Sequence, residues 1–290
     1  MRRAVLALAA LPFAALAAPV EAKPVDIAPS SPWNVDFGEN KCRLARFFGE
    51  GEDRHLLFFE QYWPGETFGM TVAGPSFKRF QSGIRTDVSF SGAQKPFQTR
   101  PFTGTVGKYG SGVIYSTLSL AKDDAARTAD EIAPARVPQL DKEIARQAEF
   151  VSLRQRGDEI RLLSGPLDEA FAVLDNCAFD LIGTWGLDVA QHRKATRLPR
   201  WINKDTVVKR IVAVYPRQAL NSGEQGIMRM RVTVSAQGMV EDCTIIKATN
   251  TEQLESPACK AMLEARFEPA LDAEGKPMRS YFAETIVYVI

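Results

Sequence analysis

The sequence has 290 residues, enough for two domains at roughly 150 residues per domain, and its 45% hydrophobic and 24% charged residues are typical of a globular protein. Its net charge of +1 excludes a protein that binds nucleic acid or an anionic membrane through overall charge alone. Two histidines, His55 and His192, and four cysteines provide few metal ligands and few general bases. The composition therefore favours a non-enzymatic protein without a metal or cofactor.

The N-terminal segment has the features of a secretory signal peptide. Two arginines precede an apolar stretch over residues 4–18, and small side chains allow cleavage after Ala22. An uncleaved membrane anchor is the alternative, but this stretch is interrupted by Pro12 and is shorter than the roughly 20 residues that span a bilayer. We therefore expect residues 1–22 to be removed and the mature protein to reside in the periplasm.

The pattern after the signal peptide predicts a β-rich domain. Residues 23–32 are rich in proline and have little to bury, so we expect an extended leader before a first domain over residues 33–188. Within that domain, apolar and polar residues alternate over residues 68–73 and 84–90, which is typical of half-buried strands. Turn signals such as Pro64-Gly65 separate the strands at short intervals, as in a meander or a sandwich.

Helical patterns follow these strands and make the domain α+β. Residues 123–132 and 140–150 are predicted to be helical, and residues 159–163 a further strand. Gly165-Pro166 then begins a longer helix, because proline is favoured in the first turn. Its apolar side chains recur every three or four residues and form one buried stripe: Leu167, Ala170, Phe171, Leu174, Cys177, Ala178, Leu181 and Ile182.

The four cysteines are candidates for disulfides, because export exposes them to an oxidising compartment, and three connectivities are possible. A core-facing Cys177 on a helix that packs on the sheet favours pairing with Cys42 on the first strand. The remaining pair, Cys243 and Cys259, would close a loop of about 15 residues and contribute about 3 kcal/mol. A four-cysteine metal site is the alternative, but the CxxC spacing that such sites favour is absent.

A basic segment over residues 189–204 is interpreted as a linker. It contains His192, Arg193, Lys194, Arg197, Arg200 and Lys204 around Leu198-Pro199. Such a segment can contact anionic cell-wall or lipid groups, but a run of charge is more often simply solvated. We therefore expect a solvated linker between two domains.

Residues 205–290 predict a small second domain. A short helix over residues 216–221 precedes a hairpin with strands over residues 226–235 and 239–248, in which Glu241-Asp242 indicates a bulge. Ser256-Pro257 then begins a helix, and residues 280–290 form a β-prone last strand. The predicted fold is a three-stranded antiparallel sheet packed on one main helix, following an N-terminal β-rich α+β domain.

This order and its landmarks are similar to the C-terminal domain of the TonB energy transducers. The landmarks are Tyr215, Pro216, Gly226, Gly238, Leu254, Arg266, Phe267, Glu268, Pro269 and Ala270. The similarity covers about 75 residues, and several landmarks in order are more specific than any one motif.

The resemblance implies a protein-binding domain that supports transport across the outer membrane. In the TonB family this domain holds a short extended segment of an outer-membrane TonB-dependent receptor, which joins the sheet beside the last strand. Carried over by position, the partner-binding residues are Phe282, Ala283, Glu284, Thr285, Ile286, Val287 and Tyr288. Which alternate set of these side chains faces the helix is left open.

TonB itself also contacts the inner-membrane motor proteins ExbB and ExbD through an N-terminal helix with a histidine, followed by a spacer of Pro-Glu and Pro-Lys repeats. Neither feature occurs in this sequence, whose first histidine is His55. Contact with ExbB and ExbD is therefore not expected.

Two other functions are consistent with the sequence. The first is a structural envelope or peptidoglycan-associated adaptor without energy transduction. The second is an enzyme within residues 33–188. Motifs such as GxSxG, HExxH, GxGxxG and the phosphate loop are absent, and the glycines over residues 104–112 are better explained by a hairpin loop. The sequence leaves open a catalytic pair of carboxylates, because acidic residues far apart in the chain can meet in the fold.

Overall fold

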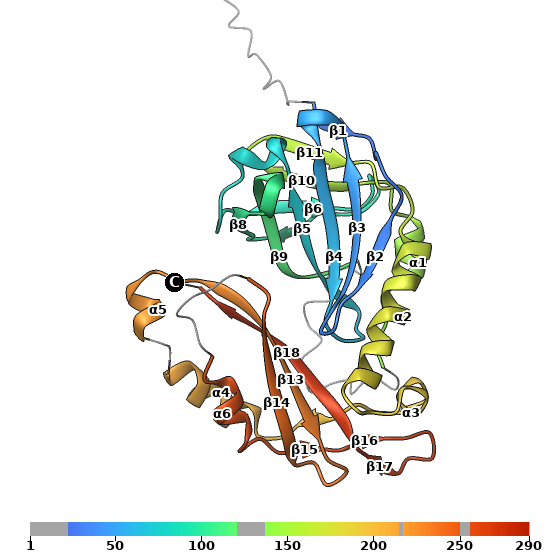
Figure 1. Cartoon of the computed structure of the whole chain (residues 1–290), viewed down its shortest axis with the longest axis vertical. Helices are drawn as coiled ribbons and strands as arrows, with labels where there is room; N and C mark the ends of the chain where they lie inside the picture. Colours follow the sequence, from blue (N-terminus) through green and yellow to red (C-terminus); the bar gives the residue numbers. More distant parts are fainter. Residues whose placement is uncertain (1–22, 121–136, 215–216, 250–255, 290) are drawn as a thin grey trace, which may run out of the picture.

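The computed structural model describes residues 23–120, 137–214, 217–249 and 256–289. The predicted signal peptide, the predicted helix over residues 123–132, and the landmarks Tyr215, Pro216 and Leu254 lie outside the described residues. The chain forms two units that are stacked along its long axis (Figure 1). We call them the N-terminal unit, the described part of residues 23–193, and the C-terminal unit, the described part of residues 200–289.

The N-terminal unit contains two β-sheets that pack face to face. The first has the order β2-β3-β4-β5-β9-β8, and its strands are β2 (Asn34–Phe37), β3 (Cys42–Phe48), β4 (His55–Gln61), β5 (Thr67–Ala73), β8 (Phe102–Thr105) and β9 (Ser111–Ser119). The second has the order β1-β11-β10-β6-β7, and its strands are β1 (Val25–Ile27), β6 (Thr86–Ser89), β7 (Phe97–Thr99), β10 (Val151–Gln155) and β11 (Asp158–Leu162). Short 3-10 turns connect some of these strands: η1 (Gly51–Asp53), η2 (Pro75–Arg79) and η3 (Gly107–Tyr109).

Alternation along the strands places one set of side chains in the space between the two sheets. Phe59 and Phe68 from the first sheet and Val88 and Leu153 from the second share one buried cluster. The leader is extended, as expected, but it is also a strand of the second sheet, because β1 pairs in parallel with β11.

The long helix α2 (Asp168–Thr184) covers one side of this core, after the short helix α1 (Lys142–Arg146). The predicted apolar stripe is buried, and the ring of Phe171 lies 5.1 Å from that of Phe59. Cys177 forms a disulfide with Cys42 of β3, with 5.9 Å between the Cα atoms. Together with the Cys243–Cys259 disulfide, this is the pairing that the sequence favours.

The segment that we expected to be a solvated linker is instead part of the folded structure. It contains the helix α3 (Val189–Arg193) and the strand β12 (Arg200–Trp201). His192 is fully buried: its Nδ1 donates to the carbonyl of Asp188 at 2.7 Å, and its Nε2 lies 3.0 Å from the hydroxyl of Ser280. Burial lowers the pKa of His192, so the ring is neutral and its Nε2 accepts a hydrogen bond from the Ser280 hydroxyl. The charge pattern missed this histidine because burial depends on contacts with residues distant in sequence.

The C-terminal unit contains the predicted three-stranded antiparallel sheet. Its order is β14-β13-β18, with β13 (Gly226–Val234), β14 (Val240–Lys247) and β18 (Ser280–Tyr288). The register between β13 and β14 shifts between Thr233 and Val234, which is the bulge expected near Glu241. Two small pairings complete the unit: β12 with β15 (Phe267–Glu268), and β16 (Ala270–Leu271) with β17 (Pro277–Met278).

Two helices cover one face of this sheet (Figure 1): α4 (Lys204–Ala213) and α6 (Ala258–Met262). Of these two helices, the sequence analysis predicted only α6. Outside this layer, α5 (Arg217–Asn221) matches the expected short helix. The opposite face of the sheet packs on the N-terminal unit, where Tyr281 shares a buried cluster with Phe179 and Ile182 of α2.

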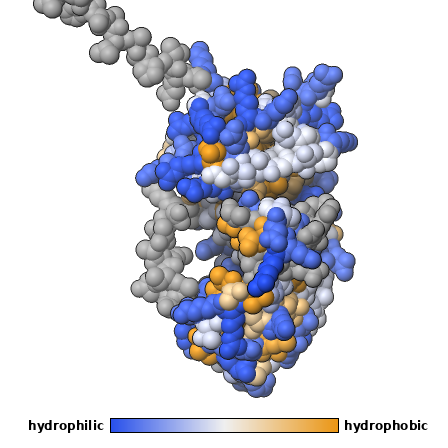
Figure 2. Space-filling model, turned by 90° about the vertical axis from the view of Figure 1, so that its left-hand side faces the viewer, coloured by the Kyte–Doolittle hydropathy of each residue, from blue (hydrophilic) through white to orange (hydrophobic). Residues whose placement is uncertain are grey.

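Surface hydropathy differs between the two units on the face shown in Figure 2. Hydrophobic residues gather on the C-terminal unit and where the two units meet, whereas the N-terminal unit is mostly hydrophilic on this face. Large exposed apolar side chains of the C-terminal unit include Val212, Leu220 and Leu263. Among the described helices, none has the length and apolar composition to cross a membrane.

The disulfide within the C-terminal unit yields a stability prediction. Cys243 and Cys259 are separated by 16 residues in sequence. Replacing both by alanine is expected to lower the free energy of unfolding in oxidising buffer by about 3 kcal/mol, because the unfolded chain gains loop entropy. Urea titrations of the variant and the unmodified protein measure the difference. Identical midpoints would show that this disulfide does not stabilise the fold.

A buried carboxylate yields a second prediction. Asp175 of α2 is 3% exposed; its Oδ1 accepts the Leu140 N–H at 3.2 Å, and its Oδ2 has no hydrogen-bond partner within the described residues. Burial raises the pKa of Asp175 from 3.8 to about 6. The folded state therefore binds the proton more tightly than the unfolded state, so the stability from this group is complete below pH 3.8 and is lost as the pH rises through about 6.

Asp175→Asn keeps an acceptor for Leu140 and removes the buried charge. We expect the variant to be more stable than the unmodified protein at pH 7.5, by up to about 3 kcal/mol, with a difference that shrinks toward pH 4. Chemical unfolding at both pH values measures this. Asp180→Asn, at an exposed position of the same helix, is the control and is expected to change nothing. Equal or lower stability of Asp175→Asn at pH 7.5 would contradict the prediction.

Candidate functional site

β18 forms one edge of the C-terminal sheet. It pairs with β13 from Val234 opposite Ser280 to Gly226 opposite Tyr288, and no described strand pairs with its other side. An edge strand presents main-chain N–H and C=O groups that have no ladder partner. This edge contains the residues that the sequence analysis assigned to partner binding.

The hydrogen bonds identify which residues of β18 direct their main chain outward. Ile227 uses its main chain on the β14 side, where its N–H donates to Thr249 and its C=O accepts from Ala248. Its partner Val287 therefore belongs to a non-hydrogen-bonded pair, and alternation extends this to Tyr281, Ala283 and Thr285. The Thr285 N–H confirms the direction, since it donates to the carboxylate of Glu284 at 3.2 Å instead of to β13.

The structure also settles which face each side chain of β18 occupies. Phe282 and Ile286 pack in the cluster beneath α4 and α6, and the ring of Phe282 lies 5.2 Å from that of Phe267. Tyr281 and Ala283 lie on the opposite face, against the N-terminal unit. Glu284, which lies between Phe282 and Ile286 in sequence, has its carboxylate 3.9 Å from the ammonium of Lys204. Other elements thus pack against both faces of β18, which leaves its edge.

A groove of about 490 Å³ runs along this edge, and we call it the β18 groove. One side is formed by residues 281–285 and Val287. The other side is formed by the connection between β4 and β5, one residue of β9, one residue before α1 and two residues of the expected linker: Trp63, Pro64, Gly65, Glu66, Thr67, Thr117, Pro138, Leu198 and Pro199. The sequence analysis missed this second side, because its residues come from four separate parts of the chain.

Arg229 connects β18 to the N-terminal unit. It is 5% exposed, donates to the main-chain oxygen of Ser116 at 2.7 Å and to the hydroxyl of Thr285, and its guanidinium carbon lies 4.9 Å from the ring centre of Tyr62. Burial lowers the pKa of Arg229, while Tyr62 and Glu60 raise it. Its Nε has no hydrogen-bond partner within the described residues. A buried cation held this way fixes the distance between β18 and β9.

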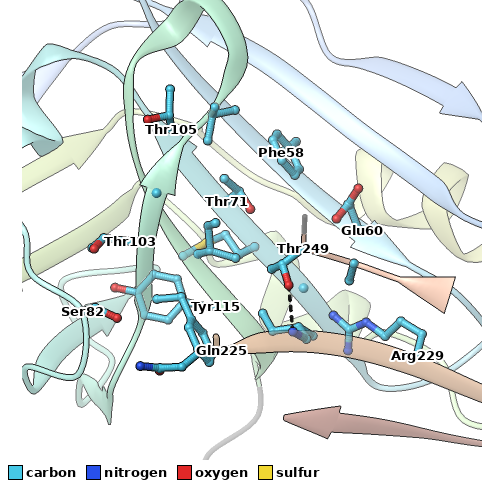
Figure 3. A pocket seen from close by; sticks show the side chains of 18 of the residues that line it. Phe58, Glu60, Thr71, Ser82, Thr103, Thr105, Tyr115, Gln225, Arg229 and Thr249 are labelled. Carbon is cyan, nitrogen blue, oxygen red and sulfur yellow. Dashed lines mark hydrogen bonds between the residues drawn. The ribbon is translucent and has the colours of Figure 1, made fainter. Parts of the chain in front are cut away.

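A second cavity, of about 590 Å³, lies between the outer face of the first sheet and the start of β13 (Figure 3). Phe58 and Thr71 line it from the sheet, and Gln225 and Thr249 from the C-terminal unit. Glu60 is the one carboxylate among its described lining residues, and it accepts hydrogen bonds from Arg43 at 2.7 and 3.0 Å. The cavity therefore does not hold the pair of acids that glycoside hydrolysis uses.

The described residues contain no group of three or more His, Cys, Asp or Glu side chains arranged to hold a metal ion. His55 is buried at the start of β4, where its Nε2 accepts the Ser76 N–H at 3.2 Å. Burial lowers the pKa of His55. Both histidines thus have local hydrogen-bond partners within the fold.

The landmarks Gly238, Arg266 and Phe267 meet around the hairpin turn, whereas Gly226 lies at the opposite end of β13. Gly238 has a φ of +78°, and a Cβ at this position would overlap the carbonyl of Phe267, so that a side chain is excluded. The Phe267 N–H donates to the Gly238 carbonyl at 2.9 Å, and Arg266 forms a bridge with Met239. Phe267 is 3% exposed, and Gly226 begins β13. The main-chain carbonyl of Pro269 accepts a hydrogen bond from the Arg197 guanidinium at 2.9 Å. The turn and the strand that follows α6 are therefore one packing unit.

Residues 212–290 match the family model of the Gram-negative bacterial TonB protein C-terminal domain. These residues form a TonB C-terminal domain. The matched range includes β13, β14, α6 and β18, and so confirms the resemblance seen in the sequence. No curated protein matches the chain.

The TonB C-terminal domain supports a TonB-like role in outer-membrane transport and, as a family property, interaction with outer-membrane receptors. The TonB family consists of energy transducers, not enzymes, and its members face the periplasm. The match covers most of the C-terminal unit but leaves out β12 and most of α4, and the N-terminal unit precedes the matched range.

Gly238 yields a third prediction, with Gly275 as a matched control. Both glycines have a positive φ, +78° and +75°, but a Cβ at Gly275 meets nothing within 4 Å. Gly275→Ala is expected to cost about 1 kcal/mol of backbone strain, whereas Gly238→Ala adds a collision with Phe267 and costs about 2 to 4 kcal/mol. Thermal unfolding of both variants measures the difference. Equal losses would show that contact with Phe267 does not explain this glycine.

Proposed function

We propose that this protein is exported to the periplasm and that its TonB C-terminal domain binds extended segments of outer-membrane receptors by strand addition beside β18, which supports transport across the outer membrane. The observation that carries the proposal is the outward main chain of Tyr281, Ala283, Thr285 and Val287 along a groove. The family match supports the class of partner.

The binding chemistry is that of a β-ladder. In an antiparallel addition, each outward residue of β18 exchanges an N–H and a C=O with the bound segment, and each hydrogen bond contributes about 1 kcal/mol net. The bond from the Thr285 N–H to the Glu284 carboxylate satisfies one donor while the edge is empty. A bound segment replaces it with a main-chain carbonyl and releases Glu284 to Lys204.

Strand addition also explains why the domain needs no strongly charged site. With a net charge of +1 for the whole chain, long-range attraction of a receptor segment is weak. Affinity then depends on main-chain pairing, and specificity depends on the pockets that alternate side chains enter.

A proline substitution tests the proposed edge. Val287 is 41% exposed and directs its N–H outward, so Val287→Pro removes a donor to the bound segment without removing a β13–β18 hydrogen bond. We expect binding of synthetic receptor-segment peptides to the mature chain to weaken by about tenfold or more, from the lost hydrogen bond and the bulk of the ring at the edge. Isothermal titration calorimetry measures the affinity.

Val287→Ala is the matched control, because it also removes the valine side chain from the groove but keeps the N–H, and it is therefore expected to bind more tightly than Val287→Pro. Circular dichroism and the unfolding midpoint establish that both variants are folded. A folded Val287→Pro variant with unchanged affinity would place the peptide elsewhere. Absence of binding by the unmodified protein, across peptides from all receptors of the source organism, would refute receptor docking.

A further inference from the structure

We infer that the N-terminal unit forms the second wall of the β18 groove, so that both units select the bound segment, favouring apolar side chains toward Trp63 and disfavouring acidic side chains near Glu66. This inference rests on the proposed strand addition. It assigns a part in recognition to a unit that precedes the matched range of the family model.

The second wall lies on a defined face of the added strand. Trp63 packs with Tyr281 and Ala283 in the cluster between the two units. In a sheet, neighbouring strands lie about 4.8 Å apart and their side chains alternate between the same two faces. Every second side chain of a segment added to β18 is therefore directed toward the face that Trp63 and Pro64 cover.

The wall is held in place before anything binds. Gln61 donates to the carbonyls of Gly65 at 2.9 Å and Thr67 at 3.2 Å, which fixes the turn between β4 and β5. Pro64 is buried within this turn. Arg229 then fixes the turn relative to β18, because it lies over the ring of Tyr62 and donates to Thr285. A preorganised groove loses little entropy on binding and discriminates well between ligands.

The composition of the groove defines the ligand. Nine of its fifteen described lining residues are apolar or aromatic: Trp63, Pro64, Pro138, Leu198, Pro199, Tyr281, Phe282, Ala283 and Val287. The charged members, Glu66 and Glu284, are both acidic. Glu284 is near Lys204, whereas exposed Glu66 forms no ion pair within the described part of the chain. A carboxylate of the ligand near Glu66 would be repelled, and an ammonium group would be attracted.

The length of the ligand follows from the edge. Residues 281–287 of β18 span about 20 Å, at about 3.3 Å per residue, so an added segment of about seven residues covers the groove. The matching ligand is an extended, uncharged or basic segment of about this length with apolar residues at alternate positions.

The test uses the mature chain and two capped synthetic peptides of alternating valine and threonine, which differ only by lysine or glutamate at one end. A receptor-segment peptide is the third probe. The unmodified protein is expected to bind the lysine peptide more tightly than the glutamate peptide. Trp63→Ala is expected to weaken binding of all three probes by about tenfold or more, because buried tryptophans often dominate binding energy. Phe37→Ala, at an aromatic residue of β2 that is 63% exposed, is the matched control.

Glu66→Lys provides a second variant that does not disturb the core, since Glu66 is exposed. It is expected to reverse the preference between the lysine and glutamate peptides, whereas Glu52→Lys, at an exposed position in η1, leaves the preference unchanged. This variant decides the inference if Trp63→Ala fails to fold.

The outcomes distinguish this inference from the proposed function. Normal affinity in Trp63→Ala together with an unchanged preference in Glu66→Lys, while Val287→Pro still weakens binding, would leave strand addition standing and refute a role for the N-terminal unit. Loss of affinity in Trp63→Ala with no effect of Val287→Pro would support a role of the N-terminal unit in binding and refute strand addition beside β18. Absence of binding of all three probes to the unmodified protein would refute both.

Discussion

The unpaired side of β18 is the constraint on which the rest of the structure depends. Main-chain N–H and C=O groups must find partners, and an edge strand with alternating apolar residues such as β18 invites pairing with any extended chain. Many proteins protect such an edge with charges, a bulge or a very short strand. Here β18 runs over nine residues, and what limits access is the turn between β4 and β5 of the other unit. In the proposed mode of binding, the same wall both protects the edge and selects the ligand.

Arg229 makes that arrangement specific. A buried guanidinium is costly to desolvate, and within the described residues it is not paired with a carboxylate; it uses a main-chain carbonyl, a hydroxyl and an aromatic ring instead. All three partners lie at the junction of the two units, so Arg229 makes these three contacts together only when β18, β9 and the β4–β5 turn are in register. His192 has a similar role at the start of β18, where its ring meets Ser280. Buried polar contacts therefore position the edge at Ser280 and at Thr285.

The sequence predicted local features well and inter-unit features poorly. Alternation over residues 226–235 indicated β13, the β propensity of residues 280–290 indicated β18, and the turn at Gly238 followed from glycine chemistry. The stripe on α2 predicted a core-facing Cys177. Arg229, by contrast, alternates with apolar residues in β13 as a solvent-facing side chain would, and His192 occurs in a basic run. Their burial results from contact with a second unit, which a pattern along the chain does not encode. Trp63 was missed for the same reason.

The position of the wall determines what kind of partner can reach β18. A preformed sheet carries neighbouring strands and side chains on both faces, and it would collide with Trp63 and Pro64 on one side of the groove. A single extended segment is thin enough to enter, because it adds one strand spacing of about 4.8 Å beside β18. Such a segment loses conformational entropy when it becomes ordered, which keeps its affinity moderate and its release fast. A groove walled by a second folded unit therefore suits repeated capture and release of a flexible receptor segment better than a permanent assembly.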